Sequence, residues 1–183
     1  GYDYLGQSRQ YVQQGSALIL TFFLSIVVIY LVLAAQFESW RDPFIILVSV
    51  PMSIAGALIF VNLGFASINI YTQVGLITLI GLIAKNGILI VDFSNRLQET
   101  RGLSKRDAVE EAAASRLRPI LMTTVAMIMA VIPLLLATGP GHVSRFQIGL
   151  VIATGLGIGT LFTLFVVPAF YVLLGRERSM VKV

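Results

Sequence analysis

The sequence predicts an all-α integral membrane protein, a bundle of about five transmembrane helices with one short interfacial cytoplasmic helix. Three observations lead to this fold class. Hydrophobic residues make up 57% of the 183 residues and charged residues only 12%, whereas soluble domains carry about 25% charged residues. The uncharged residues form long runs, and roughly 20 apolar residues suffice to span a bilayer. Glycine-containing or polar breaks divide these runs into lengths that match a membrane.

The spans are placed in the stretches that lack charged residues. Residues 10–37 carry no charge and predict the first span. The uncharged run 43–84 would form a helix of about 63 Å, twice the thickness of the bilayer core, so it must break. The segment 62–72 supplies the Asn, Gly and Ser that a loop requires. The five predicted spans are 16–36, 44–63, 74–93, 119–137 and 147–174.

The remaining segments are assigned to the two sides of the membrane. Residues 1–14 are polar and predict the end of a periplasmic domain or linker, residues 15–175 form the transmembrane domain, and residues 176–183 form a cytoplasmic tail. No cleavable signal peptide is expected. Ser104, followed by Asp107, predicts the start of an interfacial helix at 104–115. Ten Lys and Arg residues fall in one set of alternate loops and two in the other, which places the N-terminus outside and the C-terminus in the cytoplasm.

Composition also excludes several classes of protein. The chain has no cysteine, which excludes a disulfide framework, a thiolate nucleophile and cysteine-ligated metal sites. The net charge of +4 does not indicate a nucleic-acid partner, because most basic residues fall in loops on one side of the membrane. No base–nucleophile pair indicates an enzyme, and no metal site is predicted. We therefore expect no catalytic residue and no cofactor.

Lys85 is the residue most at odds with its surroundings. It lies about 16 Å into its predicted span, near the bilayer midplane, with apolar residues on both sides. A lysine at that depth costs several kcal/mol and requires a partner, normally a carboxylate. No acidic residue lies at mid-depth in any predicted span. Lys85 serves an ion or proton pathway, or forms a fixed ion pair that holds helices together, or lies less deep than the predicted boundaries indicate.

Residues near Lys85 complete the candidate site. Asp92 shares a helix face with Lys85 but lies about 10 Å nearer the cytoplasm, too far for a direct pair. Arg116 and Thr123 are also seven residues apart, on a helix that runs antiparallel. If Asp92 and Arg116 lie at similar depth, Thr123 comes level with Lys85. For Thr123 alone, a hydrogen bond from its hydroxyl to its own helix backbone is the commoner outcome. Asn86 and Asp92 are expected around the site.

Three strings of this sequence carry a resemblance to a known family. They are LAAQFESWRDPF at 33–44, GLIAKNGILIVDF at 81–93 and RLRPILMTT at 116–124. In this order, with these helices around them, they resemble the C-terminal membrane half of resistance-nodulation-division (RND) transporters. The closest resemblance is to the hydrophobe and amphiphile efflux branch, the AcrB-type multidrug pumps. It covers nearly all of residues 1–174.

The resemblance implies a function and a set of roles. The family exports drugs or other amphiphiles by proton antiport, driven by the proton-motive force without a cofactor. By similarity, Lys85 matches its relay lysine, Arg116 its cytoplasmic-side arginine and Thr123 its hydroxyl. The family's essential aspartate pair lies on a span of the N-terminal half, which is not in this sequence. The implied location is the inner membrane of Gram-negative bacteria, with this chain as spans eight to twelve.

The resemblance also implies partners and leaves alternatives. The partners are the N-terminal half of the same transporter, two further copies in a trimer, membrane lipid, a periplasmic adaptor protein and an outer-membrane channel. One alternative is an RND exporter of another cargo, such as a metal ion or a lipid. The other is a non-transport membrane module that anchors periplasmic domains, for which Lys85 would be replaceable by an apolar residue.

Overall fold

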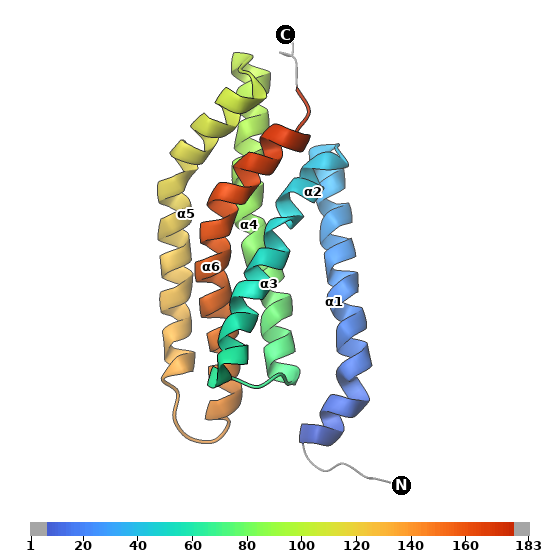
Figure 1. Ribbon diagram of the computed structural model, residues 1–183, viewed down its shortest axis with the longest axis vertical. Helices are drawn as coiled ribbons and strands as arrows, with labels where there is room; N and C mark the ends of the chain where they lie inside the picture. Colours follow the sequence, from blue (N-terminus) through green and yellow to red (C-terminus); the bar gives the residue numbers. More distant parts are fainter. Residues whose placement is uncertain (1–6, 178–183) are drawn as a thin grey trace.

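The computed structural model describes residues 7–177, and within them every regular element is a helix. Figure 1 shows an elongated bundle in which the first helix begins at one end and the last helix ends at the other. Five stretches are long and apolar enough to cross a membrane. The predicted fold class is confirmed. The first six residues of the predicted stretch 1–14 and the last six of the predicted tail 176–183 lie outside the described residues.

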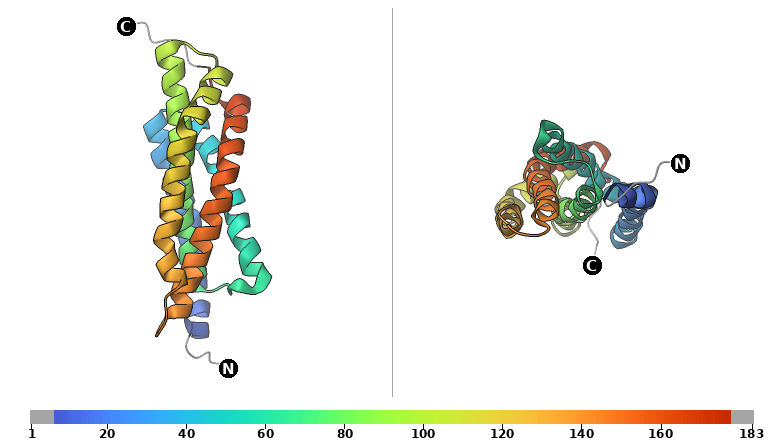
Figure 2. Two further views of the ribbon diagram at one scale, coloured as in Figure 1. Left: turned by 90° about the vertical axis from the view of Figure 1, so that its left-hand side faces the viewer. Right: turned by 90° about the horizontal axis from the view of Figure 1, so that it is seen from below.

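The helix α1, Gln7–Phe37, is longer than the span predicted at 16–36. Its membrane-spanning part is Ile19–Phe37, and the helix begins nine residues before the predicted start at 16, because no proline interrupts the polar residues there. It ends where Glu38 takes a positive φ of 49°. Figure 2 shows α1 at one side of the bundle, where its main contacts are with α2 and α4.

The second predicted span, 44–63, is divided in the structure. It consists of α2, Arg41–Leu47, and α3, Ser49–Phe60, followed by a π-helical turn at Val61–Phe65. The break at Val48 lies one turn before Pro51, whose missing N–H leaves the carbonyl of Leu47 without its helical partner. Within this turn Gly64 leaves the helical conformation, with a φ of 88° that favours glycine. The predicted break in 62–72 is therefore present.

The helix α4, Ile70–Arg101, extends beyond both ends of the predicted span 74–93. Asn69 caps its start, because its side chain accepts a hydrogen bond from the backbone N–H of Thr72 at 3.0 Å. Gly102, with φ of 64°, ends it in the left-handed conformation that closes many helices.

The predicted interfacial helix at 104–115 is not a separate element. It is continuous with the next span in one helix, α5, Lys105–Leu135. Ser104 caps this helix as predicted, accepting from the N–H of Asp107 at 3.2 Å. Figure 1 shows the first part of α5 inclined toward α4, and Pro119 permits this change of direction without ending the helix.

The last helix, α6, His142–Leu174, lies at the centre of the bundle and contacts α3, α4 and α5. Gly155 and Gly159 make this packing possible. A Cβ on Gly159 would lie 2.7 Å from both Ile83 Cδ1 and Ser53 Cβ, and one on Gly155 would collide with Leu79. Small residues four apart let membrane helices approach closely. The helices α4 and α6 run in the same direction, and α5 runs antiparallel to both (Figure 1).

Candidate functional site

Lys85 lies in the middle of α4, and its side chain is exposed in this chain. Among residues 7–177 the structure gives it no hydrogen bond and no ion pair. The three described salt bridges all involve arginines, at the end of α4 and the start of α5. The cationic side chain therefore lies on a face of α4 that the helices described here leave uncovered.

A second face of α4, about 100° around the helix from Lys85, is packed inside the bundle. Asn86, next to Lys85, is completely buried, and its Nδ2 donates to Thr160 Oγ1 on α6 at 3.2 Å. The Thr160 hydroxyl also lies 3.2 Å from Thr124 Oγ1 on α5. These three side chains join α4, α5 and α6 in one polar group inside an apolar bundle. Asn86 Oδ1 has no hydrogen-bond partner among the described residues.

This polar group fixes the level of Thr123 relative to Lys85. Asn86 and Thr124 share the Thr160 hydroxyl. One step back on each of the two antiparallel helices moves about 1.5 Å in opposite directions, so Lys85 and Thr123 lie within about one helical turn of each other along the bundle. This is the alignment that the equal spacings on the two helices predict. Thr123 is half-buried, and its hydroxyl donates to the carbonyl of Ile120 at 3.0 Å. The expected bond to its own helix backbone is thus observed.

Arg116 and Asp92 lie nearer than Lys85 to the end of the bundle where α4 ends and α5 begins. The Arg116 guanidinium carbon lies 4.4 Å from the centre of the Phe93 ring, a cation–π contact between α5 and α4. This contact places Arg116 level with the residue that follows Asp92. Asp92 itself pairs with Arg96 at 3.0 Å, and its side chain is 40% exposed. Asp92 therefore does not neutralise Lys85.

Thr160 and Thr124 were not among the residues predicted from the sequence. A hydroxyl in an apolar helix usually bonds to its own backbone, so nothing in the sequence distinguishes Thr160 from Thr163, which does so at 2.7 Å. The nearest signal is that Thr124 follows Thr123 and that Thr160 follows the close-packing Gly159. In residues 7–177 no group of three acidic or histidine side chains could hold a metal ion.

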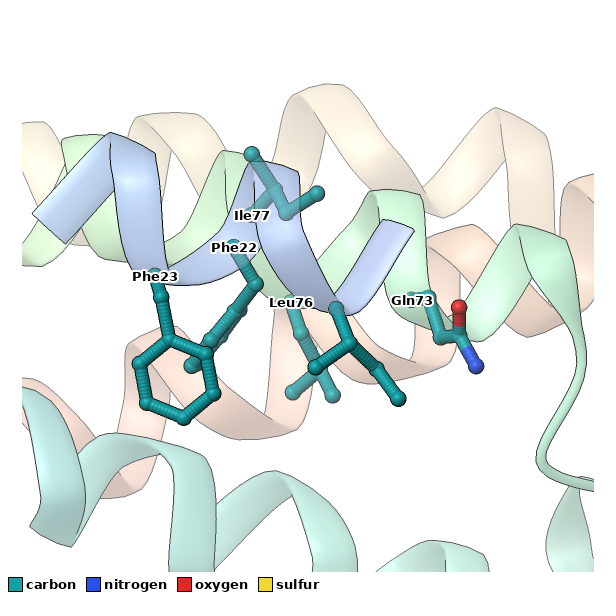
Figure 3. A pocket seen from close by; sticks show the side chains of 6 residues that line it. Phe22, Phe23, Gln73, Leu76 and Ile77 are labelled. Atoms are coloured by element: carbon teal, nitrogen blue, oxygen red, sulfur yellow. The ribbon is translucent and has the colours of Figure 1, made fainter. Parts of the chain in front are cut away.

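Two apolar cavities lie between α1 and α4. The first, of about 240 Å³, lies between aromatic side chains of α1 and aliphatic ones of α4, with Gln73 at one end (Figure 3). The second, of about 360 Å³, reaches Gly81, four residues before Lys85. Both cavities lack the convergent polar groups that fix an oriented ligand. They show that α1 leans loosely against the side of α4 near Lys85.

Comparison with known proteins identifies a family. The AcrB/AcrD/AcrF family profile matches residues 1–175. The chain is 53% identical to an uncharacterised transporter of Haemophilus influenzae, over 97% of this chain and 18% of that protein. It is 40% identical to the multidrug resistance protein MdtF of Escherichia coli over 94% of this chain, and 43% identical to the toluene efflux pump membrane transporter TtgB of Pseudomonas putida over 94%. The chain spans less than a fifth of the length of these relatives.

Proposed function

The chain belongs to the AcrB/AcrD/AcrF family, and from this premise we propose that it is the C-terminal membrane portion of a proton-driven RND efflux pump for drugs or other amphiphiles. Relatives named as multidrug and toluene efflux transporters support this proposal. The proposed location is the Gram-negative inner membrane, with the N-terminus in the periplasm and the C-terminus in the cytoplasm, which the bias of basic residues supports.

The observation that carries the proposal is the uncovered lysine in the middle of α4. A charged side chain at the centre of a membrane helix is costly unless it is paired, and no acid that pairs with it is described in residues 7–177. We propose that the partner is a carboxylate pair on a helix from the rest of the transporter, which packs on the Lys85 face of α4.

The proposed coupling follows from electrostatics. When the carboxylates are ionised, the Lys85 ammonium is held between them. When a proton enters from the periplasm and neutralises one carboxylate, the attraction weakens and Lys85 changes position. Thr123, at a similar level, exchanges its bond with Ile120 for one to this site in one of the two states. Arg116, nearer the cytoplasm, biases protonation along the exit route through its positive charge.

The polar group behind Lys85 gives this movement a route through the bundle. Asn86 is adjacent to Lys85 and bonds to Thr160, which contacts Thr124. A displacement of α4 should therefore also move α6 and α5, because these polar contacts join the three helices. We propose that two further copies complete a trimer and that a periplasmic adaptor and an outer-membrane channel complete the pump. The exposed apolar surface of α1 is available for such neighbours or for lipid.

The test is a single substitution in the full-length transporter, reconstituted in vesicles with an imposed pH gradient. Lys85→Met removes the charge and keeps an unbranched side chain. We expect dye efflux to fall to the level of empty vesicles, with normal insertion. Lys105→Met makes the same chemical change at the start of α5 and should leave efflux near wild type. Efflux that survives Lys85→Met would reduce Lys85 to a tolerated helix clamp and contradict the proposed coupling.

A further inference from the structure

A second buried polar group lies away from the level of Lys85, at the end of the bundle where α2 begins. It contains Asp42 from α2, Asn95 and Gln98 from α4, and Tyr171 from α6. None of these side chains is more than 4% exposed. Sequence analysis did not single out any of the four. Four such side chains in a membrane bundle are expensive to bury unless they satisfy one another.

These side chains form a chain of hydrogen bonds with one direction. Gln98 Nε2 donates to the Tyr171 hydroxyl at 2.8 Å. That hydroxyl donates to Asn95 Oδ1 at 2.5 Å, and Asn95 Nδ2 donates to Asp42 Oδ2 at 3.0 Å. Every donor points toward the carboxylate, which in its ionised form only accepts hydrogen bonds. Asp42 therefore sets the direction of the whole chain.

The same chain connects three helices, α2, α4 and α6. The helices α4 and α6 are joined at three levels, by Asn69 with Gln147 near one end, by Asn86 with Thr160 in the middle, and by Tyr171 with its two α4 partners. The bond from Asn95 to Asp42 adds α2 to this pair. The helix α2 is only seven residues long and is separated from α3 at Val48, so its position depends on what holds it.

We infer that Asp42, Asn95 and Tyr171 form a clamp that makes α2, α4 and α6 one rigid unit, so that a displacement of α4 at Lys85 is transmitted instead of being lost between helices. Asp42 is a positioning residue in this account, because it acts through α4 and does not touch Lys85. The inference rests on the proposed function. The clamp lies at the proposed cytoplasmic end of the bundle and carries no proton itself, which distinguishes it from the proton site at Lys85.

The clamp makes a specific prediction about coupling. Without it, protonation still displaces Lys85, but part of the displacement no longer reaches the rest of the transporter. Proton entry then continues while export falls, so the number of protons consumed per exported molecule rises. A merely structural role would lower both fluxes together, in proportion to the amount of folded protein.

The test uses the full-length transporter in vesicles with an imposed pH gradient, with ethidium as the exported probe and a pH-sensitive dye for the proton flux. Tyr171→Phe removes the hydroxyl that links Asn95 to Gln98. Asp42→Asn removes the negative charge that sets the direction of the chain and replaces one of its two acceptor oxygens with a donor. The double variant Asp42→Asn/Asn95→Asp exchanges the two groups, so that both neighbours donate to residue 95 and every bond is retained. Tyr71→Phe is the matched control, because the structure gives its hydroxyl no hydrogen bond within residues 7–177.

We expect the proton-to-ethidium ratio to rise about fivefold in Tyr171→Phe, the effect of losing roughly one net hydrogen bond, and by a similar factor in Asp42→Asn, which loses the charge assistance of the bond from Asn95. The exchanged variant should return to the wild-type ratio, and Tyr71→Phe should not change it. An unchanged ratio with both fluxes reduced, or an exchanged variant no better than Asp42→Asn, would overturn the clamp. If Asp42→Asn does not insert, the proton-to-ethidium ratios of Tyr171→Phe and the exchanged variant still test the clamp.

The failure of the two proposals can be told apart in the same experiment. Wild-type vesicles that show no pH-driven ethidium movement contradict the proposed function, and the clamp falls with it as a coupling device. Wild-type vesicles with normal coupling, together with unchanged ratios in Tyr171→Phe and Asp42→Asn, contradict the clamp alone.

Discussion

The two faces of α4 differ in burial and in charge, although their residues belong to one helix. On one face Leu79, Ile83, Asn86 and Ile90 are each at most 1% exposed and pack within the bundle. On the other, Gly81 and Lys85 are exposed. The first face folds this chain. The second carries a charge that no described residue of this chain pairs, and under the proposed function another part of the transporter covers it.

The largest expected effect concerns the uncovered face as a whole. Expressed without the rest of the transporter, this chain should insert into membranes but move no dye, because Lys85 then has no carboxylate to respond to. Co-expression of the missing part should restore efflux. Restoration should fail when the chain carries Lys85→Met and succeed when it carries Lys105→Met. Dye efflux by the chain alone would show that the proton site is complete within it.

The next effect concerns the packed face. Gly159→Ala places a Cβ 2.7 Å from Ile83 Cδ1 and Ser53 Cβ, and overpacking of this kind costs about 1–3 kcal/mol. Gly157→Ala is the matched control two residues earlier, because its Cβ would meet only Ile128 Cδ1 at 3.9 Å. Thermal unfolding of the full-length protein in detergent should show a clear loss for Gly159→Ala alone. Equal unfolding temperatures for both variants would contradict close packing of α6 on α4.

A smaller effect is expected from the polar group behind Lys85. Thr160→Val removes the hydroxyl that contacts both Asn86 and Thr124, and interhelical hydrogen bonds in membranes average about 0.6 kcal/mol. Thr163→Val, which removes a hydroxyl that bonds only to its own helix in the described structure, should cost less. The comparison is made by thermal unfolding. A greater loss for Thr163→Val would show that Thr160 does not join the helices.

The smallest effect is expected at Asp92. Its pair with Arg96 is largely exposed, and such pairs contribute about 0–1 kcal/mol. Asp92→Asn should therefore leave both the unfolding temperature and pH-driven efflux near wild type. A loss of efflux comparable to that of Lys85→Met would place Asp92 in the proton pathway, against its observed partner.

The sequence predicts the spans and the unusual position of Lys85 from the same feature. The spans are long runs without charged residues, and Lys85 is a single charge between two such runs. The sequence also predicts the start of α5 because Ser104 and Asp107 form a local cap. It does not predict that 104–115 continues into the next span, since Pro119 can end a helix or only bend it, and packing decides which. Nor does it predict Thr160 or the group around Asp42, because their partners lie 36 to 76 residues away in the chain.

Photo-cross-linking in the full-length transporter most directly tests whether the Lys85 face of α4 is covered by a segment outside this chain. A benzophenone side chain at position 85 should cross-link to a membrane segment outside residues 1–183 that carries an acidic residue. The same group at position 128, where Ile128 faces Gly157, should cross-link to α6 of this chain. Cross-links from position 85 only to lipid, or only to helices of this chain, would contradict the claim that Lys85 lies at an interface completed from elsewhere.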